Sequence, residues 1–218
     1  MEKEYPYLIV DARYEKVRIG KQVLSQGVLI ITGIGEDGYR EILAVDIAQT
    51  ETEESWSRVF RDLKERGLKG VRLVVSDNHK GLRRAVERHF QGVSWQRCQV
   101  HFCRNLLDCI PRKDKGKIGQ ELTSIFQSPD RCFALSRVNE VIKKYEDHYP
   151  KFSQRLEEGI EDTLACYYFP VSHQRRLRTT NMLERFNQEI KRRTRVVRIF
   201  PNEQACLRLI LGPLYRAE

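Results

Sequence analysis

The sequence predicts an α/β fold in which a mixed five-stranded sheet is flanked by helices and followed by a long helical region. Three observations predict it. Five short apolar runs fall within the first hundred residues, helical patterns separate the third run from the fourth and the fourth from the fifth, and the apolar spacing is helical throughout from Val100 onward. The helix between the third and fourth strands implies that these two strands form a parallel pair joined by a right-handed crossover.

The first three strands are predicted from apolar runs. The segment Tyr7–Tyr14 begins as a short apolar run that ends in Asp11, which predicts a buried strand with Asp11 at its carboxyl end. Two further strands are predicted at Val28–Ile34 and Arg40–Ile47. The residues Glu-Asp-Gly between them are typical of a hairpin turn, so this pair should be antiparallel.

The next elements alternate between helix and strand. The segment that ends at Gly67 has an acidic first turn and apolar residues at positions 56, 59, 60 and 63, which indicates an amphipathic helix. A strand at Val71–Val75, a helix from about His79 to Phe90 and a strand from about Val93 to Arg97 follow.

The remainder of the chain is predicted to be helical, with prolines as boundaries. The expected helices span residues 100–110, 115–127, 130–146 and 150–165. A basic stretch without periodicity follows, and a further helix should begin at Thr180 or Asn181, since both are good N-caps. A last short helix has Pro201 at its start.

Composition limits the possible partners. The chain has 218 residues, 40% of them hydrophobic, which is enough for a sizeable core. Its net charge of +9 favours a polyanionic partner. No signal peptide opens the chain, and no apolar run approaches the roughly 20 residues needed to span a bilayer. We therefore expect a cytoplasmic protein without a membrane partner, whose six cysteines are free thiols.

The positive charge is concentrated near the carboxyl end. Between His173 and Arg198 there are nine Lys or Arg residues and only two acidic residues, Glu184 and Glu189. This segment is either a solvated basic helix face or a surface that contacts a phosphate backbone. Glu184 is correspondingly either a surface ion-pair partner or a metal ligand. Glu189 lies five residues further on, about 500° around the helix, so it points elsewhere.

Two aspartates follow apolar strands and suggest a metal site. Asp11 and Asp77 each stand at the carboxyl end of a predicted strand, the edge where ligands collect in open α/β sheets. Two neighbouring carboxylates repel each other unless a cation lies between them, and Mg²⁺ or Mn²⁺ prefers such oxygen ligands. An aspartate after a strand is also a common turn former or helix cap, and Asp77 could cap the helix that starts at His79. Asp46 follows apolar residues as well and competes as a candidate.

Four blocks of the sequence together resemble the catalytic core of the mutator-type transposases of bacterial insertion sequences. The blocks are LIVDARY with KVR, LVVSDNHKGL, WQRCQVHFCRNLL and TTNMLERFNQEIKRRTRVVRIFPN, in the family's order across nearly the whole chain. The resemblance implies an RNase H-like fold. Residues 1–99 would form the sheet with the first two catalytic aspartates, residues 100–178 an all-helical insertion, and residues 179–218 the last catalytic helix and a tail that complete the core.

The resemblance also implies an activity. Asp11, Asp77 and Glu184 match the family's three DDE acids, separated by 66 and 107 residues. They would hold two Mg²⁺ or Mn²⁺ ions for DNA strand cleavage and for strand transfer by a freed 3′-hydroxyl. The implied partner is double-stranded DNA, both element ends and target. The joining of two ends implies a homodimer, associated with the bacterial nucleoid.

Further residues are assigned with the resemblance in view. The family has a Cys-x-x-His element after the strand that follows the second aspartate, and Cys98 and His101 match it. One such pair is half of a tetrahedral zinc site, so we expect a structural or DNA-positioning role. Arg104 and Asn105 either meet DNA or form a solvated helix face. The basic candidates for DNA binding, with one asparagine among them, are Arg175, Arg176, Arg178, Arg185, Asn187, Lys191, Arg192, Arg193 and Arg195. Asn187 shares the helix face of Glu184, so it could touch either DNA or the groups around the metal ligands.

The chain also departs from the family pattern. Full-length members carry a long amino-terminal region with helix-turn-helix character, whereas the first candidate acid here is at position 11. We therefore expect the DNA-recognition region to be missing, because the chain is an excised core, a truncated gene product or a decayed copy. Two other functions stay open: a non-autonomous derivative that binds DNA and regulates intact transposase, and an RNase H-like nuclease.

Overall fold

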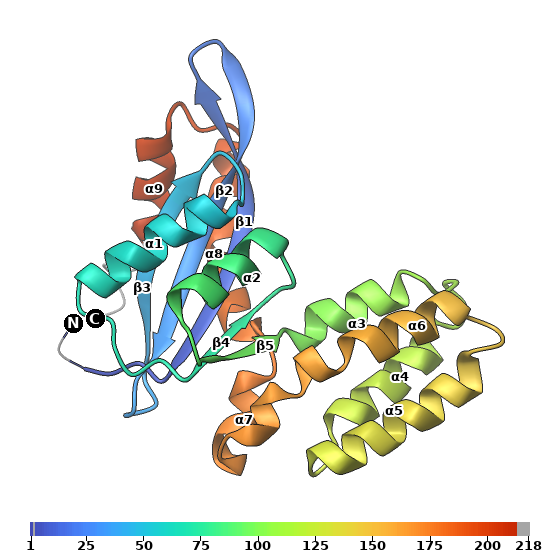
Figure 1. Cartoon of the computed structure of the whole chain (residues 1–218). Helices are drawn as coiled ribbons and strands as arrows, with labels where there is room; N and C mark the ends of the chain where they lie inside the picture. Colours follow the sequence, from blue (N-terminus) through green and yellow to red (C-terminus); the bar gives the residue numbers. More distant parts are fainter. Residues whose placement is uncertain (2, 213–218) are drawn as a thin grey trace. The chain divides into compact units, whose positions relative to one another are not determined.

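The computed structural model describes residues 1 and 3–212, although the side chains of residues 181, 182, 184 and 185 lie outside its description. The chain divides into two compact units (Figure 1). One unit is formed by Met1–Trp95 together with the segment from Thr180 onward, and the other by Gln96–Thr179.

The first unit contains a mixed five-stranded sheet with the strand order β3-β2-β1-β4-β5. Strand β1 pairs antiparallel with β2 and parallel with β4, and β2 pairs antiparallel with β3. The predicted α/β, RNase H-like fold class is confirmed. The parallel pair expected of the third and fourth strands is wrong, because β4 pairs with β1 and β3 lies beside β2. The strands are β1 (Tyr7–Ile19), β2 (Gln22–Ile34), β3 (Arg40–Ala48), β4 (Leu73–Ser76) and β5 (Ser94–Arg97).

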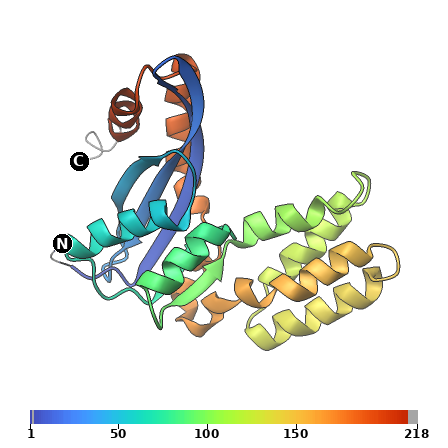
Figure 2. The same cartoon turned by 45° about the horizontal axis from the view of Figure 1, so that its top comes forward.

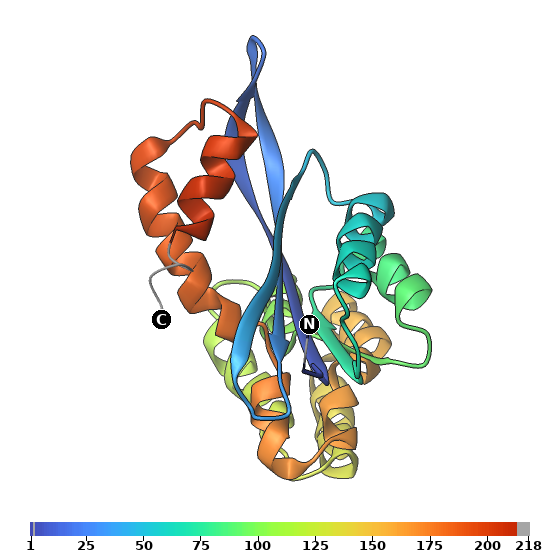
Figure 3. The ribbon, with the colours of Figure 1, turned by 90° about the vertical axis from the view of Figure 1, so that its left-hand side faces the viewer.

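Helices cover both faces of this sheet (Figure 3). Helices α1 (Glu53–Glu65) and α2 (Lys80–His89) lie on one face, and α8 (Asn181–Val197) and α9 (Glu203–Leu211) lie on the other. Trp56 of α1 is fully buried and stacks on Phe60, as its position on the apolar face of the helix predicts. The sheet is therefore the middle layer of this unit.

Strand β1 is longer than predicted. The expectation that it ends at Asp11 is wrong, because antiparallel pairing with β2 continues to Ile19↔Gln22 around a turn at Gly20, whose φ is +59°. The outer part of the hairpin is held by Phe200, which is buried. The N–H of Phe200 donates to the carbonyl of Lys16 at 2.8 Å, and its own carbonyl accepts from the N–H of Arg18 at 2.8 Å.

The second unit is helical. The expected helix 150–165 is too long, because it ends at Gly159 and two 3₁₀ turns follow. Buried Gln96 binds these turns, since its Nε2 donates to the carbonyl of Thr163 at 2.6 Å and its Oε1 accepts from the N–H of Cys166 at 2.7 Å. The stretch predicted to be irregular contains a helix, α7. The elements are α3 (Gln99–Leu107), α4 (Lys115–Phe126), α5 (Arg131–Tyr145), α6 (Pro150–Gly159), η1 (Glu161–Thr163), η2 (Ala165–Tyr168) and α7 (Val171–Leu177).

Helix length and polarity also bear on membranes. Across residues 1 and 3–212, every helix is too short or too polar to cross a bilayer.

Candidate active site

The sheet register brings Asp11 and Asp77 together. The last β1–β4 pair is Ile9↔Val75, and each aspartate lies two residues beyond its member of that pair. Asp11 therefore lies on β1 at the point where the neighbouring β4 ends, and Asp77 is the first residue after β4. Both side chains are partly buried. The register thus places the two residues side by side at the end of β4, although Asp11 is inside its own strand.

The backbone at Asp77 is fixed by a chain of hydrogen bonds. Trp95 of β5 donates from Nε1 to Oγ of Ser76 at 2.9 Å, and Ser76 Oγ donates to the carbonyl of Asp77 at 2.9 Å. The Asp77 carboxylate accepts at Oδ1 from the N–H of Asn78 at 2.7 Å. Because Ser76 is fully buried, this chain holds the start of the loop in one place.

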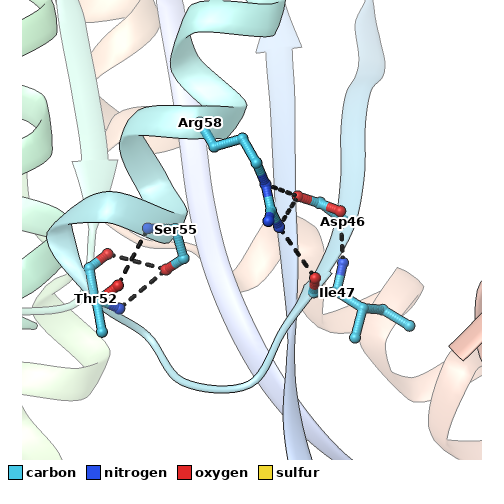
Figure 4. A network of polar contacts seen from close by, with 5 residues as sticks. All are labelled: Asp46, Ile47, Thr52, Ser55 and Arg58. Carbon is cyan, nitrogen blue, oxygen red and sulfur yellow. Dashed lines mark hydrogen bonds and ion pairs between the residues drawn. The ribbon is translucent and has the colours of Figure 1, made fainter.

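Two alternatives for the aspartates are excluded by the structure. Asp77 does not cap α2, whose N-cap is His79 without a side-chain hydrogen bond. Asp46 lies across from Leu29, which is paired with Ala12, so it faces α1, whereas Asp11 pairs with Ile30 and faces the opposite side. Figure 4 shows Asp46 accepting from Arg58 of α1, from Nη2 at 2.6 Å and from Nε at 3.1 Å.

The start of α1 is held in the same region by its own cap. Oγ1 of Thr52 accepts from the N–H of Ser55 at 3.1 Å, and Oγ of Ser55 accepts from the N–H of Thr52 at 3.0 Å (Figure 4). This reciprocal capping box fixes the helix that carries Arg58. The contacts of Asp46 are therefore those of a structural ion pair on the face opposite the candidate site.

Helix α8 lies against β1 (Figure 2). Its inward stripe includes Leu183 and Ile190, both buried, with Asn187 between them. Asn187 donates from Nδ2 to Oδ2 of Asp11 at 2.8 Å. Its main-chain carbonyl accepts from Nη1 of Arg13 at 2.6 Å. The structure thus places Asn187, a predicted DNA-binding residue, in contact with a predicted metal ligand.

Glu184 is the third predicted ligand, and its side chain lies outside the described residues. Its backbone belongs to α8, three positions before Asn187. Three residues of an α-helix rise about 4.5 Å and turn about 300°, so positions 184 and 187 share one side of the helix. The role of Glu184 stays a prediction.

The basic residues of α8 divide into two groups. Lys191 and Arg195 are exposed. Arg192 and Arg193 instead bind Glu189, with Nε and Nη2 of Arg192 at 2.9 and 2.8 Å and Nε of Arg193 at 2.7 Å. These hydrogen bonds, from Arg192 first and Arg193 second, lower the pKa of the Glu189 carboxyl to about 2. The side chain of Arg185 lies outside the described residues.

Other predicted contact residues belong to the helical unit. Arg175 and Arg176 are exposed on α7, and Arg104 and Asn105 are exposed on α3. The guanidinium of Arg178 lies over the ring of Tyr167 at 5.6 Å, so part of its role is internal to this unit.

The Cys-x-x-His element begins α3. Cys98 is the N-cap residue and is fully buried, while His101 is partly buried on the first turn. Burial, and to a smaller extent the neighbouring Cys98, raises the pKa of the Cys103 thiol to about 12. The buried position of Cys98 suits the structural role predicted for this element.

The chemistry of the site fits a hard divalent cation. Asp11 and Asp77 supply carboxylate oxygens, the ligand type that Mg²⁺ and Mn²⁺ prefer. Oδ1 of Asn187 is shielded from solvent and accepts no hydrogen bond from the residues described, so an unsatisfied oxygen lies beside Asp11. Among the described side chains, which do not include Glu184, no three His, Cys, Asp or Glu residues form a metal-binding group.

Sequence reasoning missed Arg13, and it left the role of Asn187 open between contact with DNA and contact with the groups around the metal ligands. One signal was present: Asn187 follows Leu183 by four positions and precedes Ile190 by three, which places it in the apolar stripe of the helix.

Comparisons of the sequence with known proteins all identify transposases as its relatives. Residues 1–216 match the model of the family described as "Transposase, Mutator family". The transposase for insertion sequence element ISRM5 of Rhizobium meliloti is 48% identical over 210 residues, which cover 96% of this chain and 53% of that protein. The transposase for IS256 in transposon Tn4001 of Staphylococcus aureus is 45% identical over 212 residues, 96% of this chain and 54% of its own length. The chain thus spans about half the length of these curated relatives.

Proposed function

Because the chain belongs to the Mutator family of transposases, we propose that it is the catalytic part of an insertion-sequence transposase that cuts and joins double-stranded DNA at element ends. One observation carries the proposal. Asp11 and Asp77 lie at adjacent positions on β1 and after β4, and α8, which carries Glu184, lies against the same face of β1 through Asn187. Three acids far apart in the sequence are thereby supported as one site.

In this proposal Asp11, Asp77 and Glu184 hold two Mg²⁺ or Mn²⁺ ions. When bound, such a pair of ions lowers the pKa of an attacking water or hydroxyl and stabilises the charge on the oxygens of an in-line phosphoryl displacement. The protein holds its own parts of the site in place: Trp95 and Ser76 fix the backbone at Asp77, and the hairpin with β2 fixes Asp11.

Binding of DNA is assigned to the basic residues of α8. Lys191 and Arg195 are exposed on the helix that borders the site, where they can contact phosphate oxygens. Two element ends must be brought together for joining, so we propose that the protein acts as a homodimer on DNA of the bacterial nucleoid.

The test uses a supercoiled plasmid that carries the ends of the encoding insertion sequence, with Mn²⁺. Nicking and joining are measured for the wild type, Asp77→Asn and Asp46→Asn. Both variants remove one carboxylate charge from a residue of the same sheet or directly after it. They differ in place, because Asp46 faces α1 and binds Arg58. Asp77→Asn should lower the rate about 100-fold or more, since several kcal/mol of metal stabilisation are lost. Asp46→Asn should retain the wild-type rate.

Other outcomes separate the competing functions. Nicking without joining of pre-cut ends would indicate a nuclease. DNA binding with no Mn²⁺-dependent nicking by the wild type, and equal behaviour of Asp77→Asn, would indicate a non-catalytic regulator and contradict the proposal.

A further inference from the structure

We propose that Asn187 is a positioning residue that orients the Asp11 carboxylate for its cation and fixes α8 against β1. The inference rests on the proposed function, because it takes Asp11 as a cation ligand. It adds a residue to the site whose role is defined by contacts within the protein rather than by contacts with DNA.

The first support is the contact between Asn187 and Asp11. The amide Nδ2 lies 2.8 Å from Oδ2 of Asp11. The nitrogen must face the carboxylate, because an amide oxygen at this distance would be repelled by it. A hydrogen bond to a charged acceptor is short and strong, and it restricts rotation of the carboxylate about its terminal bond. A ligand held in one orientation loses less entropy when it binds a cation.

The second support is where this amide lies on α8. Leu183, Ile190 and Thr194 share the inward stripe with Asn187, and they are 2%, 0% and 5% exposed. A polar side chain in such a stripe costs free energy unless it is hydrogen-bonded, whereas leucine at the same place would bury apolar surface. Packing alone therefore favours leucine at position 187, so the presence of an amide there needs another explanation.

The third support is the contact with Arg13. Nη1 of Arg13 donates to the carbonyl of Asn187 at 2.6 Å, and Nη2 of Arg13 lies 2.6 Å from Oε1 of Glu15. The Arg13 and Glu15 side chains are only 17% and 11% exposed. Solvent therefore weakens the charge-assisted hydrogen bond from Arg13 to the Asn187 carbonyl only a little. Asp11 and Arg13 of one strand thus bind the side chain and the backbone of one helical residue.

This double contact sets the position of α8 along β1. Residue 184 lies three positions before the anchor, about one turn of the helix. A shift of α8 along the strand would break both hydrogen bonds of Asn187, so the anchor also fixes where the backbone of residue 184 lies relative to Asp11.

The experiment compares Asn187→Leu with Gln204→Leu, the same amide-to-leucine change at an exposed position of α9. Two quantities are measured without DNA: the melting temperature of the metal-free protein and the dissociation constant for Mn²⁺ by titration calorimetry. Asn187→Leu should keep or raise the melting temperature, because leucine suits the stripe. It should weaken Mn²⁺ binding about 10-fold to 100-fold, as the loss of other partners of metal ligands does. Gln204→Leu should bind Mn²⁺ as the wild type does.

A double-mutant cycle shows whether Asn187 acts through Asp11. In an Asp11→Asn background, Asn187→Leu should weaken Mn²⁺ binding no further. Should Asn187→Leu not fold, Asn187→Ala removes the same donor without added bulk and must show the same loss.

Wild-type affinity in the leucine variant, or an undiminished loss in the Asp11→Asn background, would overturn the inference and leave the proposed function standing. Mn²⁺ binding that is absent in the wild type, or unaffected by Asp11→Asn, would overturn both.

Discussion

One substitution on α8 tests whether its basic face binds DNA. Glu189 accepts hydrogen bonds from both Arg192 and Arg193, and these hold the pKa of its carboxyl at about 2, so it is charged at neutral pH. The carboxylate offsets one of the two guanidinium charges. Glu189→Gln removes this charge and releases both arginines, so we expect the helix to bind DNA more tightly and with a stronger dependence on salt.

The magnitude follows from the number of charges released. Each further phosphate neutralised on duplex DNA steepens the slope of log K against log salt by about 0.9. One released arginine therefore adds about 0.9 to the slope, and two add about 1.8. Between about 50 and 200 mM salt, one further contact increases the loss of affinity about 3.5-fold.

The assay is fluorescence anisotropy of a labelled duplex over this range of salt, without divalent cations. Glu87→Gln is the matched control, because it removes the same charge beside an arginine, Arg83, on α2 on the other face of the sheet. The control should leave the slope unchanged. Equal steepening in both variants would show a general charge effect, and an unchanged slope for Glu189→Gln would refute the assignment of Arg192 and Arg193 to the DNA-binding face.

Three further predictions concern stability and reactivity. Gln96→Leu should lower the free energy of unfolding by about 1–3 kcal/mol in urea titrations, because the buried N–H of Cys166 loses its acceptor. Trp56→Ala, at a fully buried position, should cost about 3–5 kcal/mol by the same measurement. At pH 8 iodoacetamide should modify exposed Cys132 but not Cys103, since burial raises the pKa of Cys103 to about 12; mass spectrometry of native and unfolded protein checks this, and rapid native modification of Cys103 would contradict it.

The sequence predicts which segments form strands better than it predicts where those strands end. Apolar runs mark where strands are buried on both faces, so the parts of β1, β2 and β4 that lie under helices were predictable. The β1–β2 hairpin beyond Asp11 is not buried on both faces. Its residues are partly exposed, and it depends on main-chain pairing and on Phe200, which is distant in the sequence. Contacts of this kind leave no periodic signal.

The candidate site could likewise be predicted only in part. Asp11 and Asp77 could each be placed at the edge of the sheet from the sequence, because both follow apolar runs. The crossover did not show that they are neighbours, since the helix after β3 leads to β4 but β4 pairs with β1. The contact of Asn187 with Asp11 could not be predicted either, because it joins a helix and a strand whose residues lie 176 positions apart, and such a contact leaves no pattern in the sequence. The 3₁₀ turns after α6 likewise contact a distant residue, because Gln96 binds Thr163, 67 positions later in the chain.

The most direct measurement is the anomalous diffraction of a crystal of the protein soaked in Mn²⁺. The proposed function predicts manganese peaks bound by the carboxylates of Asp11, Asp77 and Glu184, with Asn187 still bonded to Asp11. Peaks elsewhere, or a Glu184 carboxylate that points away from the two aspartates and their ions, would contradict it.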